Sequence, residues 1–283
     1  MRIGVLPAEE VEAAWGPSGG RRLLEERFDD APEAARSIDH KPGVGYRLHA
    51  RHFGLAMVSE DGGEVLCAPP QDEPWSWQRF LVGRILPWAA VLRGVEVFHA
   101  SGVVLGGRAL AFVGATGVGK TSVALHLVLG GAGLLTDDVL AVDRSAGVLR
   151  AHPGPGIISV RPAERDRIAP ERWHRLGREL GDSGKTYVAV RREAEPHPLG
   201  AMYFLERGAA VAGVQLIDPP NPLRVVGSTF NQSIQAPARL RAQFDLCADL
   251  AAAVPMYRLG VPDGLGAAQL AELVREHADG LGG

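Results

Sequence analysis

Hydrophobic and polar positions along the first third of the chain predict a small module that mixes strands with helices. Residues 46–68 alternate apolar and polar positions, and an Asp-Gly turn at 60–63 divides them, so they predict a β-hairpin. Residues 8–15 carry a short helical pattern. Residues 74–94 place apolar side chains at helical spacing, with a proline that should kink or split the helix. We therefore expect an N-terminal α+β module over residues 1–94.

The remaining residues, 95–283, alternate short apolar runs with helical patterns and predict an α/β core. A strand over 95–101 precedes a hairpin that ends in the apolar run 108–113, and a glycine-rich turn then opens a helix. Another short strand, 134–138, follows that helix. Further strands are expected over 202–205, 213–217, 223–226 and 256–261, and further helices over 163–180, 237–254 and 265–278.

The glycine-rich turn at 114–122 reads GATGVGKTS and fits the pattern of a phosphate-binding loop, G-x-x-x-x-G-K-[ST]. Glycines let successive N–H groups turn inward as an anion nest, and the helix that follows adds its positive dipole end. Lys120 supplies a charge for the β- and γ-phosphates, and the Thr121 hydroxyl is placed to bind Mg²⁺. The predicted nucleotide-binding residues are Gly114, Ala115, Thr116, Gly117, Val118, Gly119, Lys120, Thr121 and Ser122.

Two adjacent carboxylates, Asp137 and Asp138, end the next apolar strand. A strand tip carrying Asp is where a site for a Mg²⁺-bound nucleotide needs its acidic group. Asp137 follows Lys120 by 17 residues, which leaves room for one helix between loop and acid. The pair can divide the work, one carboxylate for Mg²⁺ and one to accept a proton from an attacking hydroxyl. The sequence leaves open which does which.

His99 and Lys185 are weaker candidates. His99 lies in an apolar strand close to the loop, and the residues alone leave it between a core histidine and a catalytic one. Lys185 lies in a second Gly-Lys-Thr triplet, 184–186, which has Glu179 in place of the first glycine and no predicted strand before it. It is therefore not a second phosphate loop, but Lys185 could reach a phosphate from there or lie on the surface.

Composition narrows the class of protein. Of 283 residues, 46% are hydrophobic and 22% charged, with a net charge of −3 and no basic run, so we expect no nucleic-acid partner. No apolar window reaches the length of a membrane span and no secretory signal is expected, so the predicted location is the cytoplasm, away from membranes. Two distant cysteines predict neither a disulfide nor a zinc site.

The residues FHASGVVLGGRALAFVGATGVGKTSVALHLVLGGAGLLTDDVLAVD resemble the core of the HPr kinase/phosphorylase family. The resemblance is specific over residues 95–162 and looser beyond. It implies a P-loop kinase core of the HPr kinase and phosphoenolpyruvate carboxykinase type with a mixed sheet, which uses ATP and Mg²⁺ to phosphorylate a serine hydroxyl. It also implies that Lys120 and Thr121 hold phosphate and Mg²⁺, and that His99 lies beside Asp137 and Asp138, one of which is the base.

Departures from the family pattern are informative. The family loop ends GKSE, whereas this chain has Ser122 in place of the glutamate. The segment similar to the family's EIRGLGIID has Ala151 and Ser159 where acidic residues stand, the first of them metal-associated in the family. The N-terminal module also differs from the usual regulatory domain. These differences argue against HPr as substrate and favour a diverged branch similar to the serine kinases that modify lasso peptides.

The sequence thus predicts an N-terminal module over 1–94 and a kinase core over 95–283 that phosphorylates a serine-type hydroxyl of a peptide or protein. One alternative is a kinase for a small molecule such as free serine. Another is a regulatory module that binds nucleotide without productive transfer. The acceptor and any homo-oligomer are left open.

Overall fold

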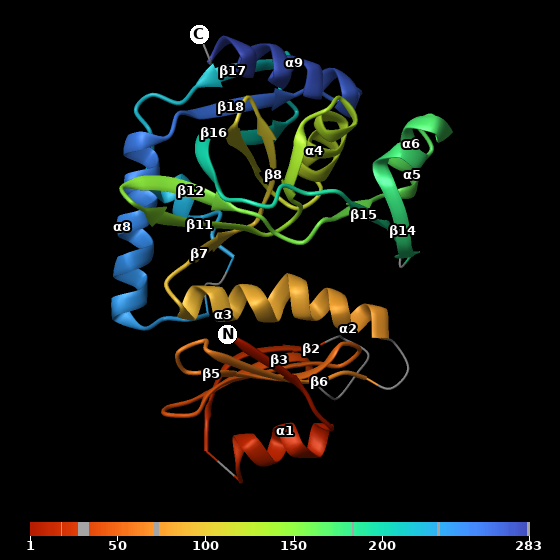
Figure 1. The fold of residues 1–283 in the computed structure, drawn as a ribbon. Helices are drawn as coiled ribbons and strands as arrows, with labels where there is room; N and C mark the ends of the chain where they lie inside the picture. The colour runs from red at the N-terminus through yellow and green to blue at the C-terminus, as the bar shows by residue number, and fades with distance from the viewer. Residues whose placement is uncertain (18, 28–33, 71–73, 183, 231–232, 282–283) are drawn as a thin grey trace. The chain divides into compact units, whose positions relative to one another are not determined.

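The structure of the chain is a computed structural model, and it consists of two compact units (Figure 1). The structure describes residues 1–283 except 18, 28–33, 71–73, 183, 231–232 and 282–283. Unit 1 comprises Met1–Val95 and Asn231–Ala236, and unit 2 comprises Glu96–Phe230 and Pro237–Gly283. Both units mix helices with strands and each has a hydrophobic core of its own.

Unit 1 is built on a six-stranded sheet. Its strands are β1 Arg2–Val5, β2 Arg21–Arg27, β3 Ala34–Lys41, β4 Gly45–Ala50, β5 Gly54–Ser59 and β6 Glu64–Ala68. They lie in the order β1-β6-β5-β4-β3-β2, and the β1–β6 pair is parallel whereas the other neighbours are antiparallel. The β-hairpin expected over 46–68 is present, with its residues in β4, β5 and β6, and the first three strands were not predicted.

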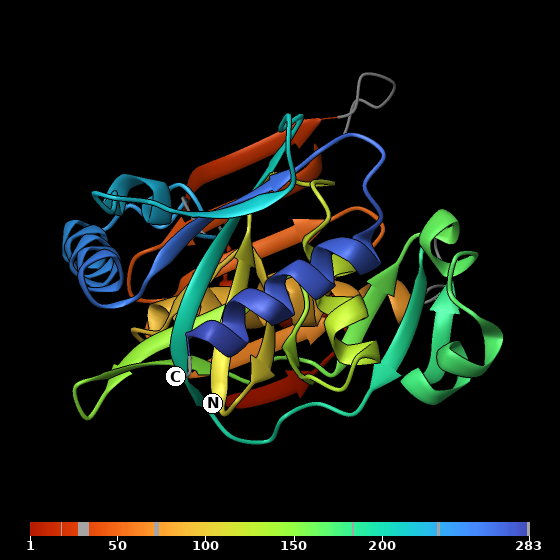
Figure 2. The same cartoon turned by 90° about the horizontal axis from the view of Figure 1, so that it is seen from above.

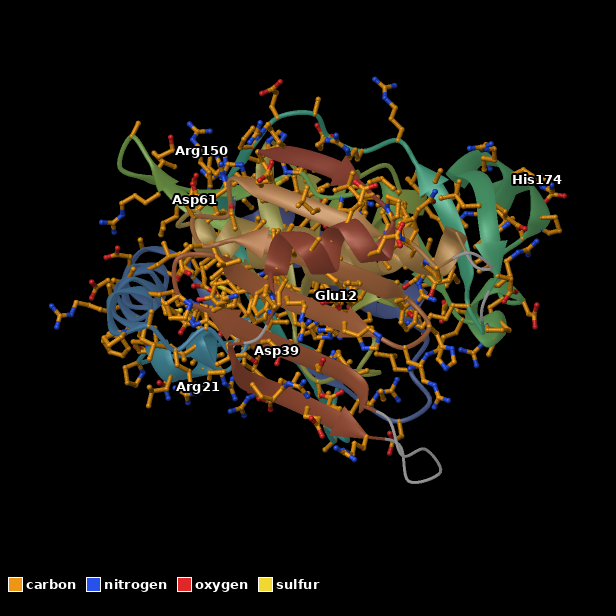
Figure 3. All side chains as sticks on the ribbon, turned by 90° about the horizontal axis from the view of Figure 1, so that it is seen from below. Glu12, Arg21, Asp39, Asp61, Arg150 and His174 are labelled. Atoms are coloured by element: carbon orange, nitrogen blue, oxygen red, sulfur yellow. The ribbon has the colours of Figure 1, made fainter. Side chains whose placement is uncertain are left out.

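Helix α1 (Ala8–Trp15) covers one face of this sheet, as the view of Figure 3 shows. Trp15, the last residue of α1, is buried, and the Arg47 guanidinium lies 5.0 Å from the centre of the Trp15 ring. Arg47 also donates hydrogen bonds to Glu12 on the helix, at 2.6 Å, and to Asp39 on the sheet, at 3.0 Å. One arginine therefore joins helix and sheet by stacking and by charge.

The helical segment expected over 74–94 is divided into three consecutive pieces. They are α2 (Pro74–Phe80), a π-helical turn (Leu81–Ile85) and α3 (Leu86–Leu92). Pro87 lies in the first turn of α3, where its missing N–H removes least hydrogen bonding. The π-helical turn just before it is where the backbone adjusts.

Unit 2 is built on a mixed sheet of nine described strands. They are β7 Glu96–Phe98, β8 Ala100–Leu105, β9 Arg108–Val113, β10 Gly133–Thr136, β11 Leu140–Ser145, β12 Val148–His152, β16 His197–Arg207, β17 Gly213–Leu216 and β18 Met256–Val261. The main order is β10-β8-β9-β16-β12-β11-β7, and β18 lies between β16 and β17. β16 runs parallel to β9 and β18, and the other pairs are antiparallel. The predicted mixed α/β class is confirmed.

Side chains of β9 alternate between two hydrophobic clusters, one on each face of the sheet. Leu110 and Phe112 pack on the face covered by α4 (Lys120–Leu129) and α9 (Ala267–Gly280), which lie side by side in Figure 2. The intervening residues of β9 pack on the other face, with α8 (Pro237–Ala253). The unbroken apolar run in the sequence thus reflects the burial of both faces of a central strand.

A small three-stranded sheet packs beside α4 (Figure 1). It consists of β13 (Ile157–Val160), β14 (Gly177–Asp182) and β15 (Thr186–Val190), with the short helices α5 (Pro162–Arg165) and α6 (Pro170–Leu176) between β13 and β14. Its core joins the core of α4 and β10 through buried apolar side chains. This sheet brings β13 next to the glycine-rich turn.

Three expected elements differ from the structure. The helical segment predicted over 163–180, with a break at Pro170, consists of the short helices α5 and α6 and ends at Leu176. The residues after it form β14, so a strand does precede the triplet at 184–186. The strand predicted over 223–226 is helix α7 (Pro222–Val226), because the Asn221 side chain accepts a hydrogen bond from the Leu223 N–H and starts a helix there. The strand predicted over 95–101 is broken at His99, as described below.

The two cysteines are free and buried, Cys67 in β6 and Cys247 in α8. Burial raises the pKa of Cys67 to about 11 and that of Cys247 to about 12. Both thiols are therefore packing groups. Within the described part of the chain, no helix has the length and apolarity that crossing a membrane requires.

Candidate functional site

The glycine-rich turn, residues 114–119, connects β9 to α4. Gly114, Gly117 and Gly119 have φ angles of 148°, 84° and 115°, a region that side chains with a Cβ rarely enter. A Cβ on Gly114 would also lie 3.0 Å from the carbonyl oxygen of Leu205. Glycine is thus needed here for backbone conformation and for space, as an anion nest at a helix N-terminus requires.

Lys120, the first residue of α4, folds back over this turn. Its Nζ donates hydrogen bonds to the carbonyl oxygens of Gly114, at 2.8 Å, and Ala115, at 3.2 Å, and the residue is only 6% exposed. Burial lowers the pKa of Lys120, and the nearby charge of Lys185 lowers it further, whereas Asp138 and Asp137 raise it. Two of the three N–H donors are used, so one is left for an anion at the turn.

Asp137 is a buried carboxylate that four hydrogen bonds hold in place. Its Oδ1 accepts from Ser101 Oγ at 2.7 Å and from Thr121 Oγ1 at 2.8 Å. Its Oδ2 accepts from the Ser159 N–H at 3.1 Å and from Ser159 Oγ at 3.3 Å. Burial raises the pKa of Asp137, these hydrogen bonds lower it, and the charge of Asp138 raises it again. The carboxylate therefore joins the end of β10 to β8, α4 and β13.

Asp138, the next residue, has the opposite environment. Its side chain is 62% exposed, and Oδ1 lies 3.2 Å from Nδ1 of His99. The same ring nitrogen is 3.2 Å from the Asp138 carbonyl oxygen. Asp138 has a φ angle of 71°, an uncommon conformation that turns its side chain away from the buried side chain of Asp137.

His99 is held in a bend between β7 and β8, and not within one continuous strand as expected. Its backbone N–H donates to the carbonyl oxygen of Ser228 at 2.9 Å. The strands on either side pair with different partners, β7 with β11 and β8 with β9 and β10. The chain must change direction between them, and the bend brings the His99 ring to Asp138.

The structure therefore gathers the predicted site residues at one end of β9. Lys120, Thr121, Asp137, Asp138 and His99 make the contacts described above, and Lys185 is near enough to Lys120 for their charges to interact. The backbone of the turn supplies Gly114, Ala115, Thr116, Gly117, Val118 and Gly119. Ser122 lies in the first turn of α4 and contacts Glu164. The roles of these residues stay predictions.

Sequence reasoning did not assign Ser101 or Ser159 to the site. Ser101 is fully buried in β8, and only its hydroxyl distinguishes it from the apolar residues around it. Ser159 was recognised as a departure from the family pattern, where an acidic residue stands. In this structure it donates two hydrogen bonds to Asp137, so the absence of a second carboxylate there has a local reason.

Thr121 and Asp137 could together hold a divalent cation. The Thr121 hydroxyl and Asp137 Oδ1 are 2.8 Å apart, and both are the oxygen ligands that Mg²⁺ prefers. The four groups that donate to Asp137 carry no formal charge, so a cation would stabilise the buried carboxylate. No cluster of three or more His, Cys, Asp or Glu that could hold a metal occurs within the described residues. Mg²⁺ at a nucleotide site needs only one or two protein ligands, because phosphates and waters supply the rest.

No protein-family model matches the chain, and no curated protein matches it. Among solved structures, the chain is similar to the HPr(Ser) kinase/phosphatase from Coxiella burnetii. The identity is 13% and the TM-score 0.37, over 66% of this chain and 99% of the other. The similarity is distant, and nothing about the substrate of this chain follows from it.

Proposed function

We propose that the protein is an ATP-dependent kinase that transfers the γ-phosphate to a serine-type hydroxyl of a peptide or protein. The observation that carries this proposal is the pairing of two unlike carboxylates beside the glycine-rich turn. Asp137 is buried and hydrogen-bonded to Thr121 on the helix that follows the turn, whereas Asp138 is exposed and contacts His99. A kinase needs one acidic group for the metal and another for the acceptor.

The glycine-rich turn and Lys120 would hold the phosphates, through backbone N–H groups and the ammonium. Thr121 and Asp137 are the oxygen ligands that would hold Mg²⁺. When bound, Mg²⁺ neutralises charge on the phosphate oxygens and keeps the reacting groups in line. Ser101 and Ser159 fix the Asp137 carboxylate, so the geometry is set before a nucleotide binds.

Asp138 is the residue that would accept the proton of the attacking hydroxyl. The acceptor oxygen forms a bond to the γ-phosphorus, the bond from that phosphorus to the bridging oxygen of ADP breaks, and the hydroxyl proton moves to the Asp138 carboxylate. His99 contacts the same carboxylate and would orient it. Lys185 would add positive charge near Lys120 as ADP leaves.

Mass spectrometry of acceptors tests the proposal. The full chain is incubated with ATP, Mg²⁺ and a panel that contains short serine peptides, a small carrier protein and free serine. One added phosphate on a peptide or protein is the expected result. Phosphoserine as the sole product would replace the proposal with a small-molecule kinase. ATP hydrolysis with no phosphorylated acceptor would replace it with a regulatory module.

Two aspartate variants check the role of Asp138. Asp138→Asn should reduce transfer by about 10² to 10⁴, the usual contribution of a general base, while the affinity for ATP changes little. Asp263→Asn is the matched control, since Asp263 is also exposed and lies outside the site. Transfer by Asp138→Asn at the wild-type rate would rule out Asp138 as the base.

A further inference from the structure

Arg161, which the sequence did not single out, lies against the glycine-rich turn. A Cβ built on Gly117 would be 3.3 Å from Arg161 Nη2, so the guanidinium lies over the backbone in the middle of the turn. Gly117 is itself exposed and has a φ angle of 84°. The absence of a side chain at Gly117 leaves both the backbone N–H groups and the guanidinium open to the same space.

The Arg161 side chain has no partner of its own across the described residues. It has neither a hydrogen bond nor an ion pair, and it is exposed. Other arginines of the same segment are engaged. Arg165 lies over the ring of Trp173, at 4.3 Å, and Arg167 lies 4.0 Å from Glu164. An uncompensated positive charge thus stands beside a backbone that is itself suited to an anion.

Arg161 lies on the same side of the glycine-rich turn as Asp137. Ser159, two residues earlier, donates both its N–H and its hydroxyl to Asp137. Arg161 continues the extended backbone of β13, with φ −71° and ψ 148°. Residues two apart in an extended chain point to the same side, so Ser159 and Arg161 both face the acid and the turn. This is the end of the site at which the transferred phosphate would lie.

Glu164 anchors the Arg161 segment to α4. Its carboxylate lies 2.7 Å from Nε2 of His126, and a hydrogen bond from Ser122 reaches it as well. The side chains of His126 and Glu164 are only 10% and 13% exposed. The backbone N–H of Glu164 donates to the Arg161 carbonyl oxygen at 3.0 Å, which closes a helical turn between them. The helix that follows the glycine-rich turn therefore also holds the segment carrying Arg161.

We propose that Arg161 is a phosphate-binding residue that contacts the γ-phosphate of a nucleoside triphosphate held in the glycine-rich turn. A guanidinium can donate two parallel hydrogen bonds to phosphate oxygens and keeps its charge at every pH. Glu164 and His126 act as positioning residues, since they hold the segment that carries Arg161 against α4. The inference rests on the proposed function, because it requires a triphosphate in the turn.

Equilibrium binding of fluorescent N-methylanthraniloyl-ATP and N-methylanthraniloyl-ADP to the full chain tests the inference. In Arg161→Ala the Kd for the ATP analogue should rise at least about tenfold, as loss of a charge-assisted hydrogen bond implies, and the Kd for the ADP analogue should rise less. The Kd of Arg161→Lys for the ATP analogue should fall between that of the wild type and that of Arg161→Ala. Arg178→Ala is the matched control, since Arg178 is exposed on β14 of the same small sheet and has no bonded partner among the described residues.

The outcomes separate this inference from the proposed function. If the wild type binds neither analogue, the proposed function fails and the inference fails with it. If the wild type binds ATP and Arg161→Ala binds it equally well, the inference alone is overturned. An equal loss for the two nucleotides overturns the assignment to the γ-phosphate.

A double-mutant cycle tests the positioning residues. Glu164→Gln keeps the size of the side chain and removes its charge. In the wild-type background it should weaken binding of the ATP analogue by a smaller factor than Arg161→Ala does. In the Arg161→Ala background it should change the Kd by less than twofold, because it acts through Arg161. The same loss in both backgrounds would show that Glu164 acts by another route and would overturn its positioning role.

Discussion

At the scale of single residues, two neighbouring aspartates have been given unlike environments. Asp137 is buried among neutral donors from three other elements, and Asp138 faces solvent beside His99. A buried carboxylate without a cation lowers stability, because the protein interior solvates the charge less well than water does. Such a residue is a sign that binding or chemistry, and not folding, determines its identity.

The pH dependence of stability should differ between the wild type and Asp137→Asn, because the variant has no buried charge at this position. The folded protein raises the pKa of Asp137 above its ordinary value of 3.8. At pH values between the ordinary pKa of the unfolded state and the raised pKa of the folded state, the folded state holds more protons than the unfolded state. Stability therefore falls as pH rises through this range. The Asn variant avoids the buried charge: its carbonyl can accept from the Ser159 N–H and its amide can donate to the hydroxyls of Ser101 and Thr121. We expect its melting temperature to exceed that of the wild type at pH 7.

Melting temperatures measured from pH 4 to pH 8 check this prediction. The advantage of Asp137→Asn should shrink as pH falls toward 4, where the wild-type carboxyl becomes protonated. Asp263→Asn, an exposed control, should show no such trend. A variant less stable than the wild type by the same margin at every pH would show that hydrogen bonding, and not charge, dominates at this position.

The lysines allow a second test at the same scale. The chain has three lysines among 30 basic residues, so arginine serves almost everywhere else. Lys120 is 6% exposed and bonded to the carbonyl oxygens of its own turn, which leaves little room for a guanidinium. Lys120→Arg should therefore reduce phosphoryl transfer by at least about 100-fold. Lys41→Arg, in unit 1, should leave it unchanged, and equal activity of the two variants in a coupled ADP assay would contradict the prediction.

The positions of the candidate residues could be predicted from sequence better than their roles. The glycine-rich turn before Lys120 can be recognised from neighbouring residues in the sequence alone. The same is true of the position of Asp137 and Asp138 at the end of a strand. The difference between the two aspartates depends on Ser101 and Ser159, which are 36 and 22 residues distant from Asp137 in sequence. Their approach depends on strand pairing across the unit, which no local pattern reveals.

At the scale of elements, the site depends on close approach between two backbone segments. Gly154 lies in the loop between β12 and β13, and its N–H donates to the Leu135 carbonyl oxygen at 3.0 Å. A Cβ at Gly154 would lie 2.1 Å from Oγ1 of Thr136, the residue before Asp137. The loop can reach β10 only because residue 154 has no side chain.

Gly154→Ala should therefore push β10 and the loop apart and move Asp137. We expect a loss of about 1–3 kcal/mol in the free energy of unfolding, typical of overpacking, together with reduced transfer. Gly213→Ala is a matched control, because a Cβ at Gly213 meets nothing within 4 Å. Urea unfolding of both variants checks the difference, and equal stability would mean that the loop yields without cost.

The elements that sequence reasoning missed have a common cause. The residues of β14, Gly177–Asp182, are mostly charged and exposed, so their pattern does not distinguish a strand from a solvated helix. Antiparallel pairing with β15 makes them a strand. In α7 the opposite occurs: the apolar run predicts a strand, but Asn221 and Pro222 begin a helix. Strands with two buried faces, such as β9, were predicted well because their apolar run is unbroken.

At the scale of the whole molecule, the contacts argued for the candidate site all belong to unit 2. Unit 1 has its own sheet, its own helix α1 and its own hydrophobic cluster. The two compact units divide after Val95, and Asn231–Ala236 are grouped with unit 1.

Hydrogen–deuterium exchange of the full chain should show where a nucleotide binds. With Mg²⁺ and ATP we expect slower exchange in three segments, 114–125, 134–140 and 157–165, because the proposed ligands and their supports lie there. At 100 times Kd, ATP should also stabilise the protein by about 2.7 kcal/mol. Lys120→Arg is the control and should show neither effect. Protection centred on α1 and the sheet of unit 1 would place the binding site elsewhere.

The burial of Cys67 and Cys247 has a practical consequence for labelling. One thiol lies in each unit, and with pKa values of about 11 and about 12 neither reacts readily with maleimide at neutral pH in the folded protein. A cysteine introduced at an exposed position, such as Arg178→Cys in unit 2 or Arg2→Cys in unit 1, would react alone without removal of the native pair. Dyes on both positions would turn the distance between the units into an optical signal that can be followed in solution as ATP is added.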